Sequence, residues 1–183
     1  MNDSLQNQKN ILRAEYKKLR DSIAQSRRRA AERKLLKHLS KFLEPYKYVL
    51  SFSSIKNEIS TEKLNQVLQE RDQLVLPKVE GDHLKLYHVK DLKQDCVVSK
   101  WGILEPDSEK CIQSSPLEVS IALVPGLAFD HKHYRLGYGK GHYDRLLKDL
   151  KSHTVGICFN EQIFQQQLPI SEYDISCLSV FSF

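Results

Sequence analysis

The sequence predicts an α/β fold, a single-domain three-layer sandwich whose mostly parallel or mixed central sheet carries helices on both faces. Two observations predict it. Short apolar runs that fit buried strands alternate with segments whose apolar residues recur at helical spacing. The chain has 183 residues, 40% of them hydrophobic and 28% charged, which suits one well-filled core. We therefore expect residues 1–183 to form one domain.

The first part of the chain predicts two helices packed on this core. From about Ser4 to Arg20 the apolar residues recur mostly at helical spacing. Ser26 is a plausible N-cap for a second helix over Arg27–Leu43, which Pro45 ends. The next expected elements are a strand at Tyr48–Phe52, a helix at Thr61–Arg71, a short strand at Leu74–Leu76 closed by Pro77, and a half-exposed strand at His83–Val89.

The second part predicts the centre of the sheet and its main loop. Residues 90–118 are typical of a loop-rich segment, and Ile121–Val124 is the strongest candidate for a buried strand. Ligands bind outside the carboxyl ends of strands in such sheets, so the loop after this strand is the first place to expect chemistry. That loop runs to about Gly139, and the remaining expected elements are a helix at about 141–151 and strands at Thr154–Phe159 and Leu178–Phe183 with a short helix between them.

The composition excludes several classes of protein. No stretch approaches the roughly 20 apolar residues that cross a bilayer, and the N-terminus lacks the apolar core of a secretory signal, so we expect a cytoplasmic protein without a membrane partner. Nothing in the sequence demands more than a monomer. The four cysteines lack C-x-x-C spacing and are expected to be free thiols: Cys96, Cys111, Cys158 and Cys177. The net charge of +5 suits either nucleic acid or a small anionic ligand.

The segment Arg135–Arg145, RLGYGKGHYDR, carries the strongest local signal. Its three glycines alternate in a strand-to-helix connection, where successive backbone N–H groups can face an anion at the start of a helix. Arg135 and Lys140 could supply charge to phosphoryl oxygens, and Asp144 could hold Mg²⁺. The spacing is neither that of a Walker A loop nor that of a dinucleotide fingerprint. A tight turn with a helix cap is the alternative, but the flanking charges favour a phosphate-binding loop.

Together with PGLAFD at 125–130, this segment resembles the signature of 5-formyltetrahydrofolate cyclo-ligases. The resemblance covers nearly the whole chain, through K-x-x-L-R at 9–13, S-F at 51–52 with E-I-x-T at 58–61, W-G-I-x-E-P at 101–106, and L-P at 168–169 with Asp174. Three positions depart from the family pattern. His133 stands where glycine is common, His142 replaces the first of two aromatic residues, and Leu178 stands where a second acid is frequent.

The resemblance implies that 5-formyltetrahydrofolate and MgATP are converted to 5,10-methenyltetrahydrofolate, ADP and phosphate. The ATP-binding residues it implies are Lys9, Leu12, Arg13, Arg135, Leu136, Gly137, Tyr138, Gly139, Lys140, Gly141, His142 and Tyr143. The substrate-binding residues it implies are Ser53, Glu58, Trp101, Tyr138, Gly139, Lys140, Gly141 and His142. Asp144 and Asp174 are the implied Mg²⁺ ligands. The partners would be these small molecules, and the basic excess suggests the polyglutamate tails of cellular folates as a further contact.

Several of these residues also have purely structural interpretations. Lys9 and Arg13 could form a solvated basic helix face, Glu58 could cap a helix, and Trp101 could be a core or lid residue. Two other function classes stay open. The run at 27–29, three arginines, suggests a nucleic-acid-binding module, although no aromatic residues are interleaved with it and we expect no nucleic-acid partner. A phosphoryl transferase with a similar loop but another substrate is the second.

Overall fold

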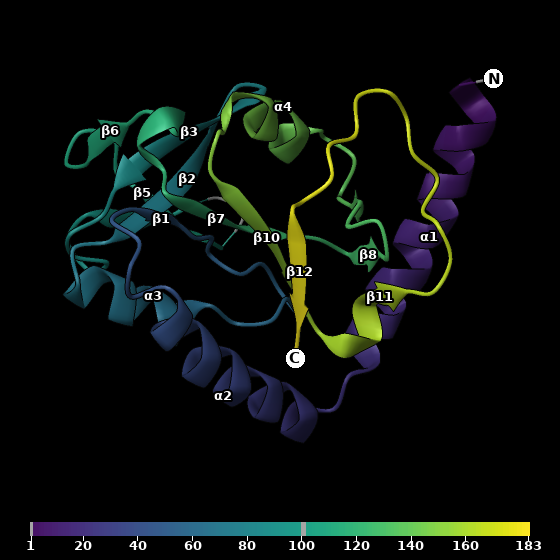
Figure 1. Ribbon diagram of the computed structural model, residues 1–183, viewed down its shortest axis with the longest axis horizontal. Coiled ribbons are helices and arrows are strands. Elements are labelled where there is room, and N and C mark those ends of the chain that lie inside the picture. The colour runs from purple at the N-terminus through teal and green to yellow at the C-terminus, as the bar shows by residue number, and fades with distance from the viewer. Residues whose placement is uncertain (1, 100–101) are drawn as a thin grey trace.

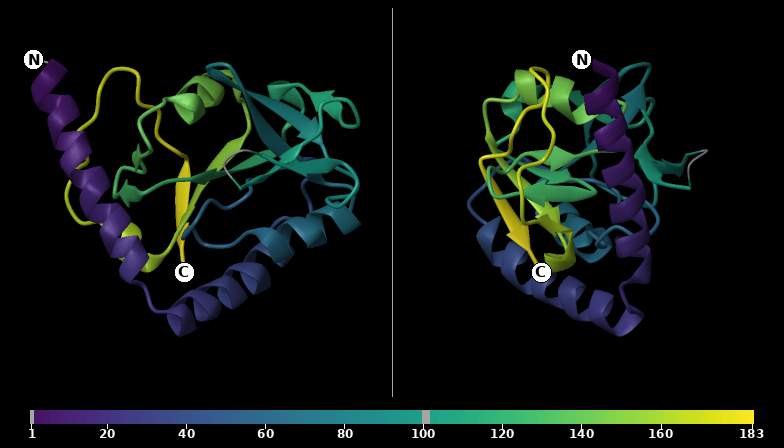
Figure 2. Two further views of the ribbon diagram at one scale, coloured as in Figure 1. Left: turned by 180° about the vertical axis from the view of Figure 1, so that it is seen from behind. Right: turned by 90° about the vertical axis from the view of Figure 1, so that its right-hand side faces the viewer.

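The computed structural model describes residues 2–99 and 102–183. A seven-stranded sheet forms the middle layer, with α2 (Gln25–Phe42) and α3 (Glu62–Glu70) on one face and α4 (His142–Asp149) on the other (Figure 1). The predicted three-layer α/β architecture is therefore confirmed. The first helix, α1 (Asn2–Ser22), lies outside these layers at one end of the molecule, beside the small strand β8 (Figures 1 and 2).

The sheet is mixed, as predicted. Its order is β12-β10-β7-β1-β2-β3-β6; the first five of these are parallel, β3 pairs antiparallel with β2, and β6 pairs antiparallel with β3. The strands are β1 (Val49–Leu50), β2 (Leu74–Glu80), β3 (His83–His88), β4 (Cys96–Val98), β5 (Leu104–Pro106), β6 (Ile112–Ser114), β7 (Ile121–Pro125), β8 (Ala128–Asp130), β9 (Arg135–Leu136), β10 (His153–Cys158), β11 (Ile163–Phe164) and β12 (Ser179–Ser182). Two single turns of 3-10 helix are η1 (Pro116–Glu118) and η2 (Asn160–Gln162).

The core lies on both faces of the sheet. Leu35 and Leu39 from α2 and Leu68 from α3 are at most 1% exposed and pack on one face. Leu146 of α4 covers the other face together with Phe129. Fully burying a side chain of this size contributes about 1.5–3 kcal/mol, so the sandwich depends on these two layers. A third apolar cluster fixes α1, because Tyr16 packs with the residues that flank and follow β8.

The second helix begins two residues earlier than predicted, at Gln25. Ser26 lies inside α2, and Ala24 is the residue that precedes the helix, with its carbonyl accepting from Arg28 N at 3.0 Å. The reason is the side chain of Arg28, which donates from Nε to Ile23 O at 3.0 Å and so fixes the bend between the two helices. A buried side-chain contact therefore sets the start of this helix in place of a serine cap.

The prediction that Pro77 closes its strand is wrong, because β2 continues to Glu80. Val75 O accepts from Ser51 N at 2.9 Å, so the backbone polar groups of residue 75, and of Pro77 two residues later, face β1. The pairing of β1 with β2 ends at Val75. Proline lacks an N–H, but at this position no partner strand needs it.

The segments predicted as loops contain short strands. Residues 90–118 carry β4, β5 and β6, and residues 126–139 carry β8 and β9. Strands of two or three residues hold too few side chains to show an alternating pattern. The β8–β9 turn is fixed by the buried carboxylate of Asp130, whose Oδ1 accepts from Lys132 N and Tyr134 N at 2.9 and 3.0 Å.

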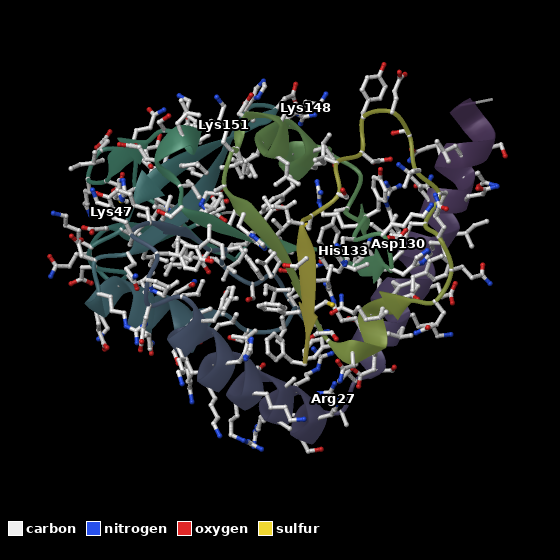
Figure 3. All side chains as sticks on the ribbon, viewed as in Figure 1. Arg27, Lys47, Asp130, His133, Lys148 and Lys151 are labelled. Carbon is white, nitrogen blue, oxygen red and sulfur yellow. The ribbon has the colours of Figure 1, made fainter. Side chains whose placement is uncertain are left out.

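His133 lies in this turn with a φ of 62°, a left-handed conformation that glycine adopts most easily (Figure 3). A glycine would adopt this conformation without strain, whereas histidine here carries some strain.

The cysteines agree with the prediction of free thiols. All four are unpaired, and Cys158 and Cys177 are core residues at 1% and 4% exposure. Burial raises the pKa of both thiols, Cys177 to about 11. Among residues 2–99 and 102–183, no helix has the length and apolar character that a bilayer crossing requires.

Candidate functional site

The glycine-rich loop connects β9 to α4, beyond the carboxyl end of the central strand β7. Gly139 and Gly141 have φ values of 98° and 66°, which other residues adopt only with strain. Gly141 stands directly before α4 and leaves the first N–H groups of that helix without a side-chain cap. Positive φ values and a helix start without a side-chain cap are compatible with anion binding at this loop, which stays a prediction.

Helix α1 lies against this loop. Arg13 Nε donates to Gly137 O at 2.9 Å, across 124 positions of sequence. A Cβ added at Gly139 would stand 3.2 Å from Arg13 Cζ, so the guanidinium packs directly on the loop backbone. The residue is half-buried, and the structure brings it to the loop as the resemblance implies. Leu12, half-buried, packs in the apolar cluster that anchors the helix.

Lys9, one turn earlier on α1, is held by a carboxylate from the far end of the chain. Its Nζ donates to Asp174 Oδ2 at 2.5 Å, and the same oxygen accepts from Ser171 N at 2.6 Å and Ser171 Oγ at 2.9 Å. Burial alone would raise the pKa of Asp174, but the hydrogen bonds from Lys9 and Ser171 outweigh it and hold this pKa below its ordinary value. Asp174 is therefore an ionised carboxylate with one oxygen fully occupied.

The second predicted metal ligand, Asp144, lies next to this pair. Its Oδ1 accepts from Arg135 Nη2 at 2.6 Å and from Ile175 N at 3.1 Å. Arg135 also donates from Nη1 to Ile175 O at 2.6 Å, and its side chain is only 3% exposed. Arg135 is thus occupied with Asp144 and the backbone. Within the described residues, Asp144 Oδ2 makes no hydrogen bond.

The buried acid Glu58 faces the opposite side of the loop. It lies between β1 and α3, is 8% exposed, and accepts from Ile55 N at 2.9 Å. Tyr138 of the loop donates its hydroxyl to Glu58 Oε1 at 3.2 Å, and Arg20 Nη2 donates to that hydroxyl at 2.7 Å. Burial raises the pKa of Glu58, and the hydrogen bond from Ile55, the positive charge of Arg20 and the hydrogen bond from Tyr138 oppose this shift.

The loop that carries Glu58 is internally braced. Ser54 Oγ donates to Ile59 O at 2.8 Å and accepts from Thr61 N at 3.0 Å, so its two ends are tied together. Ser53, half-buried, precedes this brace. Glu58 accepts only from Ile55 N of this loop, so the interpretation of Glu58 as a helix-capping acid receives no support from its contacts.

The C-terminal side of the glycine loop is tied to the β2–β3 turn. His142 Nδ1 lies 3.0 Å from Asp82 O, and Arg145 donates to the same carbonyl from Nε at 2.8 Å. Arg145 Nη2 also donates to Lys140 O at 2.8 Å. The loop is therefore held from α1 on one side and from this turn on the other. Tyr143, half-buried, packs on the core beneath α4.

Arg20 is a member of this site that the motif analysis did not identify. It is 2% exposed and contacts both Glu58 and Tyr138. A signal was present, because Lys9, Arg13 and Arg20 follow one another at spacings of four and seven residues, which place them on one helix face. The basic composition of the whole helix concealed it.

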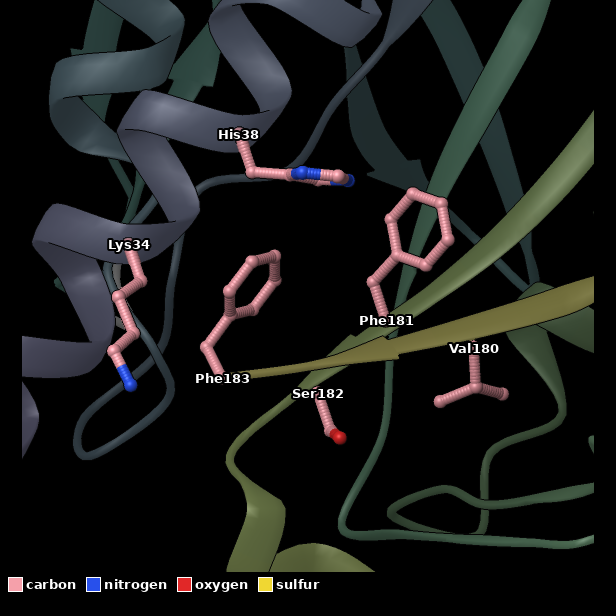
Figure 4. Close-up of a pocket in the computed structure, with 6 residues that line it drawn as sticks. All are labelled: Lys34, His38, Val180, Phe181, Ser182 and Phe183. Carbon is pink, nitrogen blue, oxygen red and sulfur yellow. The ribbon is translucent and has the colours of Figure 1, made fainter.

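Some features lie outside the site. Trp101 falls outside the described residues. A hollow of about 460 Å³ lies between α2 and β12, where Lys34 and His38 face Phe181 and Phe183 (Figure 4). It is lined by no residue predicted to bind ligand.

The arginine run at 27–29 does not form one cationic surface. Arg27, at the bottom of Figure 3, pairs with Glu161 at 2.8 Å, Arg28 is 7% exposed and bound to carbonyls, and Arg29 is exposed. Two of the three charges are therefore used within the fold, which removes the observation that suggested nucleic-acid binding.

Comparison with known proteins gives a consistent result. The model of the 5-formyltetrahydrofolate cyclo-ligase family matches residues 5–182. A fission yeast protein named "probable 5-formyltetrahydrofolate cyclo-ligase" is 34% identical over 134 residues, which are 65% of this chain and 66% of that protein. The mouse 5-formyltetrahydrofolate cyclo-ligase is 28% identical over 183 residues, covering 90% of this chain and 88% of the mouse protein.

Solved structures agree. The Aquifex aeolicus 5,10-methenyltetrahydrofolate synthetase is 34% identical and superimposes with a TM-score of 0.83, covering 94% of this chain and 88% of that one. A Mycoplasma pneumoniae 5,10-methenyltetrahydrofolate synthetase has a TM-score of 0.75 at 23% identity, with 94% and 96% covered, and shows a shared fold.

Proposed function

The chain belongs to the 5-formyltetrahydrofolate cyclo-ligase family, and from this membership we propose that it closes the ring of 5-formyltetrahydrofolate to give 5,10-methenyltetrahydrofolate. The reaction uses ATP and Mg²⁺ and releases ADP and phosphate. The nucleic-acid alternative loses its support, because two of the three arginines that suggested it are engaged within the fold.

One observation carries the proposal: the glycine loop joins two chemically different neighbourhoods. On one side it touches the cationic face of α1 through Arg13, and on the other Tyr138 reaches the buried carboxylate Glu58. A phosphate-binding loop next to a carboxylate suited to N–H donors is what a reaction between ATP and a pteridine requires.

The cations next to the loop are proposed to bind ATP phosphates. Lys9 and Arg13 extend from α1, Lys140 extends from the loop, and the backbone of 137–141 surrounds the phosphate position. Arg135 would act mainly by fixing Asp144, since both of its terminal nitrogens are engaged. Catalysis of phosphoryl transfer depends on such alignment and charge neutralisation.

Asp144 is the carboxylate that suits Mg²⁺. Mg²⁺ commonly takes one or two protein carboxylates and completes its shell with phosphates and water, so a larger acidic cluster is not required. Among the described residues each acid keeps one oxygen without a hydrogen bond, Oδ2 of Asp144 and Oδ1 of Asp174. The other oxygen of Asp144 accepts two hydrogen bonds, whereas that of Asp174 accepts three, one of them from the ammonium group of Lys9. These contacts support a different role for Asp174, that of holding Lys9. When bound, the metal would neutralise charge on the transferring phosphate.

On the folate side, Glu58 is proposed to accept from the ring N–H groups of the pteridine, with Ser53 in the adjoining loop and residues 138–142 along the ligand. The chemistry explains the need for ATP. The oxygen of the formyl group on N5 attacks the γ-phosphorus of ATP and ADP departs, leaving an N5-iminium phosphate. N10 then attacks the formyl carbon, phosphate leaves with the former formyl oxygen, and the N10 proton is lost.

The proposal is tested by mixing the protein with MgATP and 5-formyltetrahydrofolate and following the absorbance of the methenyl product. We expect product only when ATP and Mg²⁺ are both present. ADP formation without methenyl product would indicate another phosphoryl acceptor and would reject the proposal. A monomeric state, a cytoplasmic location and a preference for polyglutamylated substrate stay predictions, and sedimentation, cell fractionation and affinities for both substrate forms would test them.

A further inference from the structure

The guanidinium of Arg20 is buried beside the proposed site with part of its hydrogen-bonding capacity unused. The residue is 2% exposed. Its Nη2 donates to Tyr138 OH at 2.7 Å, while Nη1 lies 3.5 Å from Glu58 Oε1 as an ion pair that is not a hydrogen bond. Within the described residues, Nε and Nη1 have no hydrogen-bond partner. Leaving a buried donor of a charged group unpaired is energetically costly. Two such donors on one side chain therefore indicate that a ligand supplies the acceptor.

The position of Arg20 is fixed from behind by a second buried arginine. Arg28 donates to the carbonyl of Arg20, to Asn57 O at 2.7 Å and to Ile23 O at 3.0 Å. These bonds tie the end of α1 to the loop that carries Glu58. Each donor group of Arg28 binds a backbone carbonyl, so Arg28 has a structural role. Arg20, in contrast, has two donor groups without a hydrogen-bond partner among the described residues.

The Tyr138 hydroxyl shows which chemistry this place accepts. It takes a hydrogen bond from Arg20 and gives one to Glu58, so a donor and an acceptor are satisfied by a single polar group between them. The edge of a pteridine that presents a ring N–H next to the 4-oxo oxygen offers the same pair of functions. Tyr138 is 42% exposed and lies between Gly137 and Gly139, the latter with a φ of 98°, so it can move aside.

We infer that Arg20 is a substrate-binding residue that donates to the 4-oxo oxygen of the pteridine while Glu58 accepts from the neighbouring ring N–H, with the ligand displacing the hydroxyl of Tyr138. This inference rests on the proposed function and adds a residue that determines which substituent the site prefers at position 4 of the pteridine. A site with a fixed charged donor favours a carbonyl at position 4 and disfavours an amino group, which is itself a donor.

The test measures the affinities of 5-formyltetrahydrofolate and of its 4-amino analogue by calorimetry for the wild type, Arg20→Lys and Arg20→Met. The wild type should prefer the 4-oxo compound. Arg20→Lys, which keeps the charge opposite Glu58, should lose about 10- to 100-fold in affinity for the 4-oxo compound and little for the analogue, so the preference collapses. ATP affinity should change less than about 2-fold.

Arg27→Gln is the matched control, because Arg27 is a partly buried arginine paired with Glu161 away from this site; it should leave both folate affinities unchanged. Far-UV circular dichroism establishes that each variant is folded, and Arg20→Lys serves if Arg20→Met does not fold. An unchanged preference in Arg20→Lys, or an equal loss for both ligands, would overturn the inference while leaving the proposed function intact. A wild type that binds neither compound would overturn both.

Discussion

Replacing Asp174 with asparagine separates two roles that this carboxylate could have. If it positions Lys9, the variant loses an ion pair and weakens ATP binding; if it binds Mg²⁺, the variant changes the metal requirement. Asparagine keeps the shape and one oxygen for Ser171, but Lys9 Nζ, now 2.5 Å from a charged oxygen, loses its negative partner. We expect the first outcome.

The magnitude follows from the exposure of the pair. The side chains of Lys9 and Asp174 are 11% and 20% exposed, so this ion pair is intermediate between a surface pair and a buried one. Surface pairs contribute up to about 1 kcal/mol, and disrupting a buried pair costs about 3–5 kcal/mol. We therefore expect Asp174→Asn to lower the free energy of unfolding by about 1–2 kcal/mol. A similar loss of phosphate positioning would raise the KM for ATP about 10-fold.

The stability difference also has a defined pH dependence. Burial opposes ionisation of Asp174, yet its hydrogen bonds with Lys9 and Ser171 lower its pKa below the ordinary value of 3.8. A group with a lowered folded pKa stabilises the protein above its unfolded pKa and loses that effect as the pH falls through the folded pKa. The difference in free energy of unfolding between wild type and Asp174→Asn should thus be largest near neutral pH and disappear as the pH falls below 3.8.

Urea unfolding at several pH values gives the stability, and initial rates at saturating Mg²⁺ give the KM for ATP. The Mg²⁺ concentration for half-maximal rate is measured in parallel and should be unchanged. A large shift of that concentration with an unaltered KM for ATP would refute the argument and identify Asp174 as a metal ligand.

Three further predictions concern single positions. Asp144→Asn should raise the Mg²⁺ concentration for half-maximal rate about 10-fold or more, and an unchanged metal titration would remove Asp144 from the metal site. Gly156→Ala should lower the free energy of unfolding by about 3 kcal/mol, because the new Cβ would stand 2.4 Å from Phe129 Cε1. Its control Gly137→Ala, whose Cβ meets nothing within 4 Å, should stay within about 0.5 kcal/mol in the same urea experiment; equal effects would contradict the packing argument. His133→Gly should raise this free energy by about 0.5–1 kcal/mol because it relieves a φ of 62°, and a loss of stability would show that the imidazole contributes more than the strain costs.

The layers of the fold could be predicted from the sequence because their signals are local. The buried run at 121–124 and the helix at 62–70 each carry enough apolar residues at one period to define the element. The short strands could not be predicted, since β8 and β9 depend on the carboxylate of Asp130 and on pairing with one another. Pro77 misled the prediction because only the end of β1 explains why a proline is tolerated there.

Part of the candidate site could likewise be predicted from the sequence, and part could not. The loop and the pair Lys9 and Arg13 follow from spacing and from the family resemblance. The partnership of Lys9 with Asp174 joins residues 165 positions apart, which no local pattern contains. Arg20 is distinguished from the other basic residues of α1 only by its burial against Glu58, and burial of one cation among many emerges only from the packed structure.

The most direct measurement follows the formyl oxygen. The protein is incubated with MgATP and 5-formyltetrahydrofolate labelled with ¹⁸O in the formyl group, and the released phosphate is analysed by mass spectrometry. We expect each phosphate to carry one ¹⁸O, and ADP, phosphate and methenyl product to form in equal amounts, because the formyl oxygen is phosphorylated before N10 displaces it. Phosphate without the label, formed together with methenyl product, would contradict this mechanism.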